Sequence, residues 1–299
     1  MSEHLIGAVV ERSPGPRYFE SLRFAEIAPR RPLPKASVFA KWRAGAPEQA
    51  RFTLRPPPET WRGTAGPFRD APNKSEGAQW MARAHDALAA DAIVLVTGTD
   101  LTPGPRDRER LATWAGHLAG GGKRRIVWQP GGLWDIDEAA TFANSLGVVC
   151  AFDPLESPAP TGEIAYARVR AIGARSRLGE GLLSAIVESI AASDAATIYL
   201  AIESELGFKK ARRVSELLAD LREESGGTGV LRRGGGGIVI DLGDEEEDEE
   251  DEELDEDEED EEDEELDEDE EADEDEDLDD EGDEDLDDED DEDDEDEDE

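Results

Sequence analysis

Cysteine, histidine and long apolar runs are all scarce in this chain of 299 residues. The single cysteine, Cys150, excludes a disulfide framework and is typical of a reducing compartment. It lies in an apolar segment, so we interpret it as a buried small side chain rather than a reactive thiol. No apolar run approaches the roughly 18 residues of a membrane-spanning helix, and the first residues lack the apolar core of a signal peptide. These absences predict a cytoplasmic protein that does not enter a membrane.

Metal and cofactor motifs are absent as well. His4, His85 and His117 are scattered, and none has a second His or Cys at the spacing of metal ligands. The four-glycine run at 234–237 lacks the Gly-Lys-Ser/Thr of a phosphate-binding loop and the spacing of a dinucleotide fingerprint. We therefore expect neither a bound metal nor a cofactor.

Negative charge, by contrast, is abundant and confined to one end. The formal net charge is −48, and 50 of the 56 residues in 244–299 are Asp or Glu, which leaves residues 1–243 close to neutral. Such a segment buries almost nothing and repels itself, so it is predicted to be a disordered tail. Its physical uses are solubility, capture of basic proteins, weak binding of divalent cations and competition with nucleic acid for a basic surface. Direct nucleic-acid binding by the chain itself is not expected.

Apolar runs bounded by Gly and Pro predict eight β-strands, at residues 5–10, 24–27, 50–55, 92–97, 125–128, 148–152, 164–170 and 197–202. Helical spacing falls between most of them, at residues 18–22, 33–42, 76–88, 106–118, 137–146, 182–192 and 209–221. This alternation predicts an α/β fold, a TIM-type (β/α)8 barrel over residues 1–225. A Gly-rich connector at 226–243 and the tail at 244–299 follow. The 153–163 link is expected to be helix-free, and 59–75 a long loop of a kind that is often functional.

In such a barrel the C-terminal ends of the strands form the site. The residues placed there are Glu26, Arg55, Thr97, Gln129, Asp153, Arg168, Arg170 and Glu203. Their carboxylates and guanidinium groups would suit an anionic ligand or a division of general acid and base roles. Two carboxylates would also suit a glycosidase, but the sequence does not set their separation.

The alternative is structural. Glu26 would pair with Arg168, since a bare carboxylate inside a barrel is costly, while Asp153 would cap the turn at Pro154. Trp134, with Trp128, would pack between strand and helix or stack on a ligand.

Three motifs occur in a distinctive order, VWQPGGLW (127–134), GVVCAFDPL (147–155) and AYARVRAIG (165–173). Together they resemble the YecE-like family of uncharacterised proteins, domain of unknown function seventy-two, over about residues 5–223. The resemblance implies a TIM barrel without a settled reaction. Several mouth residues depart from the family pattern: Gln129 replaces a Glu, Gly131 an Arg, Arg170 a His, and Ile202-Glu203 an asparagine pair.

These exchanges favour a divergent, non-catalytic binding or scaffold protein whose tail contacts its partners. The alternative is an enzyme or small-molecule binder that acts on an anionic substrate at the barrel mouth.

Overall fold

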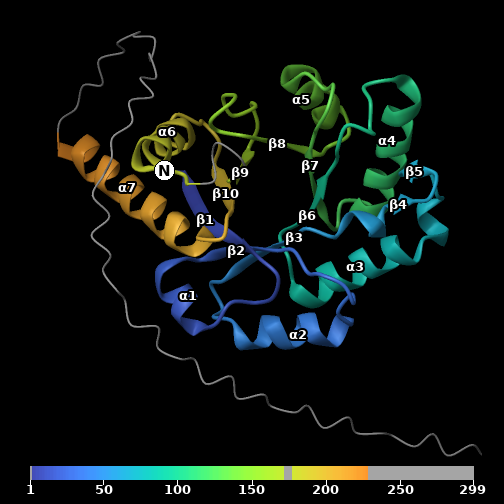
Figure 1. Cartoon of the computed structure of the whole chain (residues 1–299), viewed down its shortest axis with the longest axis horizontal. Helices are drawn as coiled ribbons and strands as arrows, with labels where there is room; N and C mark the ends of the chain where they lie inside the picture. The colour runs from blue at the N-terminus through green and yellow to red at the C-terminus, as the bar shows by residue number, and fades with distance from the viewer. Residues whose placement is uncertain (1, 172–176, 228–299) are drawn as a thin grey trace, which may run out of the picture. The chain divides into compact units, whose positions relative to one another are not determined.

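Eight parallel strands close into a barrel (Figure 1). The structure, a computed structural model, describes residues 2–171 and 177–227. Each barrel strand pairs with the next along the chain, and the last pairs with the first. The strands are β1 (Glu3–Val10), β2 (Phe24–Ile27), β3 (Arg51–Leu54), β6 (Ala92–Val96), β7 (Arg125–Gln129), β8 (Val149–Phe152), β9 (Ile164–Arg170) and β10 (Thr197–Glu203). The predicted TIM-type barrel and all eight of its strands are confirmed.

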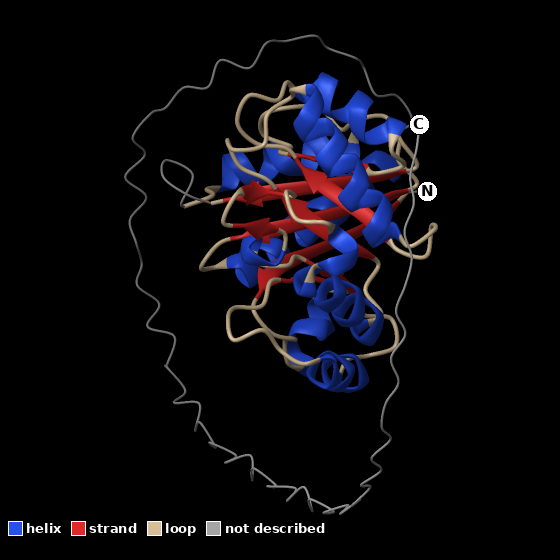
Figure 2. Ribbon diagram, turned by 90° about the vertical axis from the view of Figure 1, so that its right-hand side faces the viewer, coloured by secondary structure: helices blue, strands red, loops and turns tan. Residues whose placement is uncertain are grey.

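Helices surround the strands, which run side by side with their C-terminal ends on one side (Figure 2). The helices are α1 (Pro16–Ser21), α2 (Ala36–Gly45), α3 (Glu76–Leu88), α4 (Pro105–Ala119), α5 (Ile136–Ser145), α6 (Glu180–Ala191) and α7 (Gly207–Gly227). Their starts follow local chemistry. Ser75 accepts a hydrogen bond from the Ala78 amide at the start of α3, and Asp135 accepts two at the start of α5. The link between β8 and β9 contains no helix, as predicted.

Period-two alternation divides the strand residues between two environments. One set packs outward against the helices and includes Phe52, Trp128 and Ile202. The other set fills the barrel interior, where Phe24 and Tyr199 are among the buried side chains. The same alternation that builds this interior decides which polar side chains point into the barrel at its C-terminal end.

The segment from 58 to 75 is more ordered than its sequence indicates. It contains two 3-10 turns, η1 (Pro58–Thr60) and η2 (Pro72–Lys74), and a small antiparallel hairpin of β4 (Arg62–Gly63) with β5 (Gly66–Pro67). The long loop predicted at 59–75 therefore contains short ordered elements, which the sequence does not indicate because strands of two residues leave no periodic pattern. Through η1 and η2 the segment packs onto α3 and α4.

At the C-terminal side, α7 extends to Gly227 and so into the first residues of the predicted connector. The rest of that connector and the predicted tail at 244–299 lie outside the described residues. Within the part of the chain that the structure describes, none of the helices combines the length and apolarity required to cross a membrane.

Candidate functional site

Six of the predicted mouth residues converge because they share the inward phase of their strands, and one of them is Arg170, the last residue of β9. Glu26 follows Phe24 by two residues in β2, and Arg168 follows Tyr166 by two in β9. Arg55, Gln129 and Glu203 hold the corresponding positions after β3, in β7 and in β10. Strands running in parallel bring these positions to the same end of the barrel. Position and alternation together therefore build one polar cluster, which we call the mouth network.

A buried ion pair forms the centre of the mouth network. Arg168 donates through Nε to Glu26 Oε2 at 3.0 Å and through NH2 to Glu26 Oε1 at 2.9 Å. The two side chains are 3% and 0% exposed, respectively. Burial alone would lower the pKa of Arg168, but the Glu26 charge raises it, so the guanidinium stays protonated. This is the pairing that the structural interpretation of the two residues predicts.

Two residues of the network escaped the sequence analysis. The Tyr166 hydroxyl donates to Glu26 Oε2 at 2.8 Å and lies 2.7 Å from the Thr53 hydroxyl. Burial, followed by the Glu26 charge, raises the pKa of Tyr166 well above its ordinary value, so it remains a neutral donor. Both residues sit two positions before a predicted mouth residue, Thr53 before Arg55 and Tyr166 before Arg168. Extending the alternation one step down each strand would have identified them.

The outer part of the network is an arginine-rich rim around Glu203. Arg55 NH2 donates to Glu203 Oε1 at 3.0 Å, while its Nε lies 3.1 Å from Glu26 Oε1. Arg168 NH2 also reaches Glu203 Oε2 at 3.2 Å, and Arg170 Nε lies 3.7 Å from the same oxygen. Partial burial would raise the pKa of Glu203, but Arg55, Arg168 and Arg170 hold it below its ordinary value. Glu203 is therefore an anion at neutral pH.

Gln129 also contacts the ion pair, because its Oε1 accepts a hydrogen bond from Arg168 NH1. Both Glu26 oxygens thus face two nitrogen or hydroxyl groups each, and all three nitrogens of the Arg168 guanidinium have an acceptor. The Glu26 carboxylate thus accepts three hydrogen bonds within the network.

Above the rim lies a cavity of about 880 Å³, over the C-terminal ends of β1, β2, β3, β9 and β10. We call it the mouth cavity; Arg30, Arg55, Glu59 and Glu203 contribute its charged lining, along with Glu11, Arg31 and Glu205. The Arg30 and Glu11 side chains pair at 2.5 Å. The volume is within the range of small-molecule sites, and the cavity reaches the network only through Arg55 and Glu203.

Two predicted mouth residues lie apart from this network. The Asp153 carboxylate accepts the Leu155 amide at 2.9 Å, so it caps the turn that follows β8. The Trp134 ring stacks on Phe142 and meets Trp128 edge-on, and its Nε1 donates to the Leu101 carbonyl at 3.0 Å. Both residues line a separate cavity of about 310 Å³ that also includes Gln129.

Thr97, also placed at the mouth by the sequence, has the outward phase. Its hydroxyl accepts from Trp128 Nε1 at 2.9 Å, beneath the helix layer. Cys150 is buried in β8, and burial raises its pKa to about 12, which leaves the thiol protonated at neutral pH. Over residues 2–171 and 177–227, no group of three or more His, Cys, Asp or Glu side chains is arranged to hold a metal ion.

Comparison with solved structures places this barrel among its relatives in fold. A DUF72 family protein from Thermotoga maritima matches with a TM-score of 0.53 and 14% identity, over 74% of this chain and 99% of that one. A DUF72 family protein from Enterococcus faecalis matches with a TM-score of 0.52 and 11% identity, over 75% and 99% of the two chains. The chain has the DUF72 fold. The resemblance predicted from the tryptophan and D-P-L motifs is thus confirmed at the level of the fold.

No family model matches the sequence, and no curated protein matches it either. The DUF72 fold therefore rests on structure and on the ordered motifs, at identities that carry no residue-by-residue inference about activity.

Proposed function

We propose that this DUF72-type barrel is a non-catalytic binding protein, with the carboxylate-rich segment 244–299 as its contact to basic proteins or divalent cations. The supporting observation at the barrel is the state of Glu26. Its Oε2 accepts from Tyr166 and Arg168 and its Oε1 from Arg168, at distances of 2.8 to 3.0 Å, while Arg55 Nε lies 3.1 Å from Oε1. A general base needs a lone pair within reach of substrate, and here three hydrogen bonds from the protein already occupy the buried carboxylate.

The segment 244–299 supports the proposal by its composition alone. Its 50 carboxylates give a local density of negative charge that attracts basic surfaces over about a Debye length, roughly 8 Å at physiological salt. Contacts of this kind are strongest for partners with clustered Lys and Arg, and they weaken as salt rises.

Affinity capture with three chains tests this role. The first is the full chain, the second ends at residue 243, and the third keeps its length but carries Asn and Gln in place of the Asp and Glu of 244–299. Partners retained by the full chain and lost from both variants, with salt-dependent release, support the proposal. Recovery of the same partners by the chain that ends at 243 contradicts it, provided that all three barrels melt at the same temperature.

A second candidate function is favoured by the mouth cavity itself. Its volume of about 880 Å³ and the guanidinium groups of Arg30, Arg31 and Arg55 would suit a small anionic ligand that competes for them with Glu11, Glu59, Glu203 and Glu205. Thermal shift with inorganic phosphate, citrate and glucose 6-phosphate tests it. Stabilisation that Arg55→Gln abolishes, and that Arg51→Gln at the opposite end of the barrel leaves intact, would support anion binding at the barrel mouth.

A further inference from the structure

The two carboxylates of the mouth network differ in their access to solvent. The Glu26 side chain is 0% exposed, whereas the Glu203 side chain is 26% exposed and lines the mouth cavity together with Arg55. A solute in the cavity can therefore reach the position of the Glu203 carboxylate, but it cannot reach that of Glu26.

Three guanidinium groups surround the Glu203 carboxylate. Arg55 NH2 contacts its Oε1 at 3.0 Å, Arg168 NH2 contacts its Oε2 at 3.2 Å, and Arg170 Nε lies 3.7 Å from Oε2. Each oxygen thus faces a guanidinium group of its own, which is how arginines recognise a carboxylate. With Glu26 included, three arginines face two carboxylates, so the network holds one positive charge in excess.

Glu203 cannot leave this position without a replacement. If its side chain turned into solvent, the Arg168 guanidinium, which is only 3% exposed, would lose an acceptor, and the three arginines would face Glu26 alone. A buried charge without compensation is costly, and another anion in the same position would remove that cost. The backbone need not move in such an exchange, because the Glu203 carbonyl accepts the Ala171 amide at 2.9 Å whichever way the side chain points.

Much of the remaining lining of the mouth cavity is apolar. Val, Ala and Pro make up half of the lining residues, among them Val9, Val10 and Pro57. Proline rings have little conformational freedom, so this wall is formed in advance. A carboxylate bound next to Arg55 would have room beside it for an apolar body that packs on these side chains.

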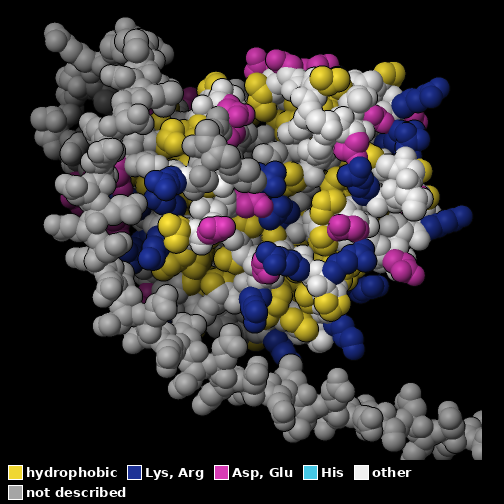
Figure 3. Space-filling view, viewed as in Figure 1, with side chains coloured by type: hydrophobic (Ala, Val, Ile, Leu, Met, Phe, Trp, Pro, Cys, Tyr) yellow, Lys and Arg dark blue, Asp and Glu magenta, His cyan; other side chains and the backbone are white. Residues whose placement is uncertain are grey.

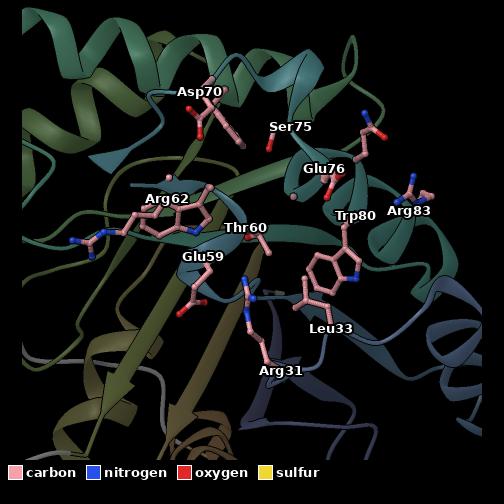
Figure 4. A pocket seen from close by; sticks show the side chains of 15 residues that line it. Arg31, Leu33, Glu59, Thr60, Arg62, Asp70, Ser75, Glu76, Trp80 and Arg83 are labelled. Carbon is pink, nitrogen blue, oxygen red and sulfur yellow. Dashed lines mark hydrogen bonds between the residues drawn. The ribbon is translucent and has the colours of Figure 1, made fainter. Parts of the chain in front are cut away.

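The other charged residues of the lining are exposed, unlike Arg55 and Glu203. Arg30 pairs with Glu11 at 2.5 Å. Arg31 and Glu59, which have opposite charges, also line a neighbouring cavity of about 630 Å³ between the 58–75 segment and α3 (Figure 4). Exposed charges are well hydrated and screened by salt, so they attract an anion less strongly than the guanidinium groups around Glu203.

We propose that the mouth cavity binds a small organic acid with an apolar body, whose carboxylate takes the place of the Glu203 carboxylate among the three arginines. Without such an acid, Glu203 is the internal ligand of this site. It therefore limits the affinity, because the incoming acid has to displace a group of the same chemistry. This inference rests on the second function proposed above, anion binding at the barrel mouth, and it specifies the ligand class and the residue that the ligand displaces.

Titration calorimetry of the full chain with benzoate tests the proposal. We expect wild type to bind benzoate with a Kd of about 1 mM and to bind acetate, which lacks the apolar body, more weakly. Benzamide, the neutral isostere, should not bind. Glu203→Gln should raise the affinity for benzoate at least about tenfold, because a neutral amide competes less well for guanidinium groups than a carboxylate does. Glu203→Asp, whose carboxylate is withdrawn by one methylene, should have an intermediate affinity.

Glu216→Gln is the matched control. The Glu216 carboxylate also contacts two arginines, Arg212 at 3.5 Å and Arg213 at 3.4 Å, but it lies on α7 and outside the lining of the mouth cavity. The substitution should leave the affinity for benzoate within about twofold of wild type, a change of under 0.5 kcal/mol. Melting temperatures establish that all variants are folded.

Three results would overturn the proposal. One is equal affinity of benzoate for wild type and Glu203→Gln with both chains folded, since Glu203 would then not occupy the site. Another is equal binding of benzamide and benzoate, which would remove the role of the guanidinium groups. The third is the lack of benzoate binding to all of these chains. If citrate or phosphate still stabilised wild type, anion binding at the mouth would stand without this inference; if no anion did, both would fail.

Discussion

The two ends of the barrel carry the same three kinds of side chain in different surroundings. At the mouth, Arg168 and Tyr166 converge on Glu26, and the ion pair is 3% and 0% exposed. At the N-terminal end, Arg51 Nε pairs with Asp91 at 2.7 Å, and the Tyr199 hydroxyl donates to the same oxygen at 3.0 Å. There the Arg51 side chain is 40% exposed.

Burial therefore separates two clusters that are chemically alike. A buried pair that loses one partner leaves an uncompensated charge, whereas a partly exposed pair that loses one partner is resolvated. The rings of Tyr166 and Tyr199 stack 5.5 Å apart inside the barrel, so the two clusters also meet through their tyrosines. On the face of the molecule seen in Figure 3, Lys and Arg side chains lie among Asp and Glu.

The largest effect should come from breaking the buried pair. Arg168→Met leaves Glu26 without its bidentate partner, and we expect the free energy of unfolding to fall by about 3–5 kcal/mol. Urea denaturation followed by circular dichroism measures it. Arg168→Lys, which keeps a charge but not the planar fork, should fall between wild type and Arg168→Met. A loss below about 1 kcal/mol for Arg168→Met would show that the mouth is as hydrated as the other end.

Much of the fold was visible in the sequence, and the reason is local. Apolar strands and their crossovers leave strong patterns, so the barrel followed from residues such as those of 92–97 and 125–128. The placement of Glu26 and Arg168 at strand ends followed from topology. Their burial did not, because it depends on Tyr166 and Thr53 beneath them and on which neighbours close over them.

Phase and tertiary packing account for the errors. Thr97 was placed at the mouth from its position alone, yet it has the outward phase and bonds Trp128. The cavity of about 630 Å³ between the 58–75 segment and α3 has no signal in the sequence, because Trp61, Gly77 and Arg31 meet only once that segment packs on α3.

Removing one tyrosine hydroxyl at each end of the barrel compares the two clusters by a smaller change. Tyr166→Phe removes a donor from buried Glu26 and breaks the contact with Thr53, so we expect a loss of about 1–3 kcal/mol. Tyr199→Phe should lower the free energy of unfolding by only about 0.5–1.5 kcal/mol, because Asp91 remains paired with Arg51 and is partly exposed to solvent. Equal losses in urea denaturation would contradict the difference in burial.

Alkaline pH tests the burial of the Tyr166 and Tyr199 hydroxyls without a mutation. Burial raises the pKa of Tyr199 to about 12 and that of Tyr166 well above the ordinary value of about 10. The stability that the neutral tyrosines contribute is complete below about pH 10 and is lost as pH rises toward and beyond 12. Near-ultraviolet absorbance should show little tyrosinate at pH 11 in the native chain, and half ionisation near pH 10 in guanidinium chloride. A native midpoint near 10 would contradict burial of both hydroxyls.

The smallest effect is expected at the N-terminal end. Arg51→Met removes a partly exposed ion pair while Tyr199 still donates to Asp91, so the free energy of unfolding should fall by about 0.2–1 kcal/mol. The loss should shrink further in high salt, which screens exposed charges. A salt-independent loss comparable to that of Arg168→Met would remove the distinction between the two ends.

A double-mutant cycle on Glu26 and Arg168 tests most directly whether the two residues stabilise the barrel as a coupled pair. The chains are wild type, Glu26→Leu, Arg168→Met and the double variant, compared by urea denaturation. We expect each single variant to be strongly destabilised and the double variant to recover at least about 2 kcal/mol of the summed loss, because no unpaired charge remains buried. Losses that add within about 0.5 kcal/mol would mean that Glu26 and Arg168 act independently and that Glu26 is available for other chemistry.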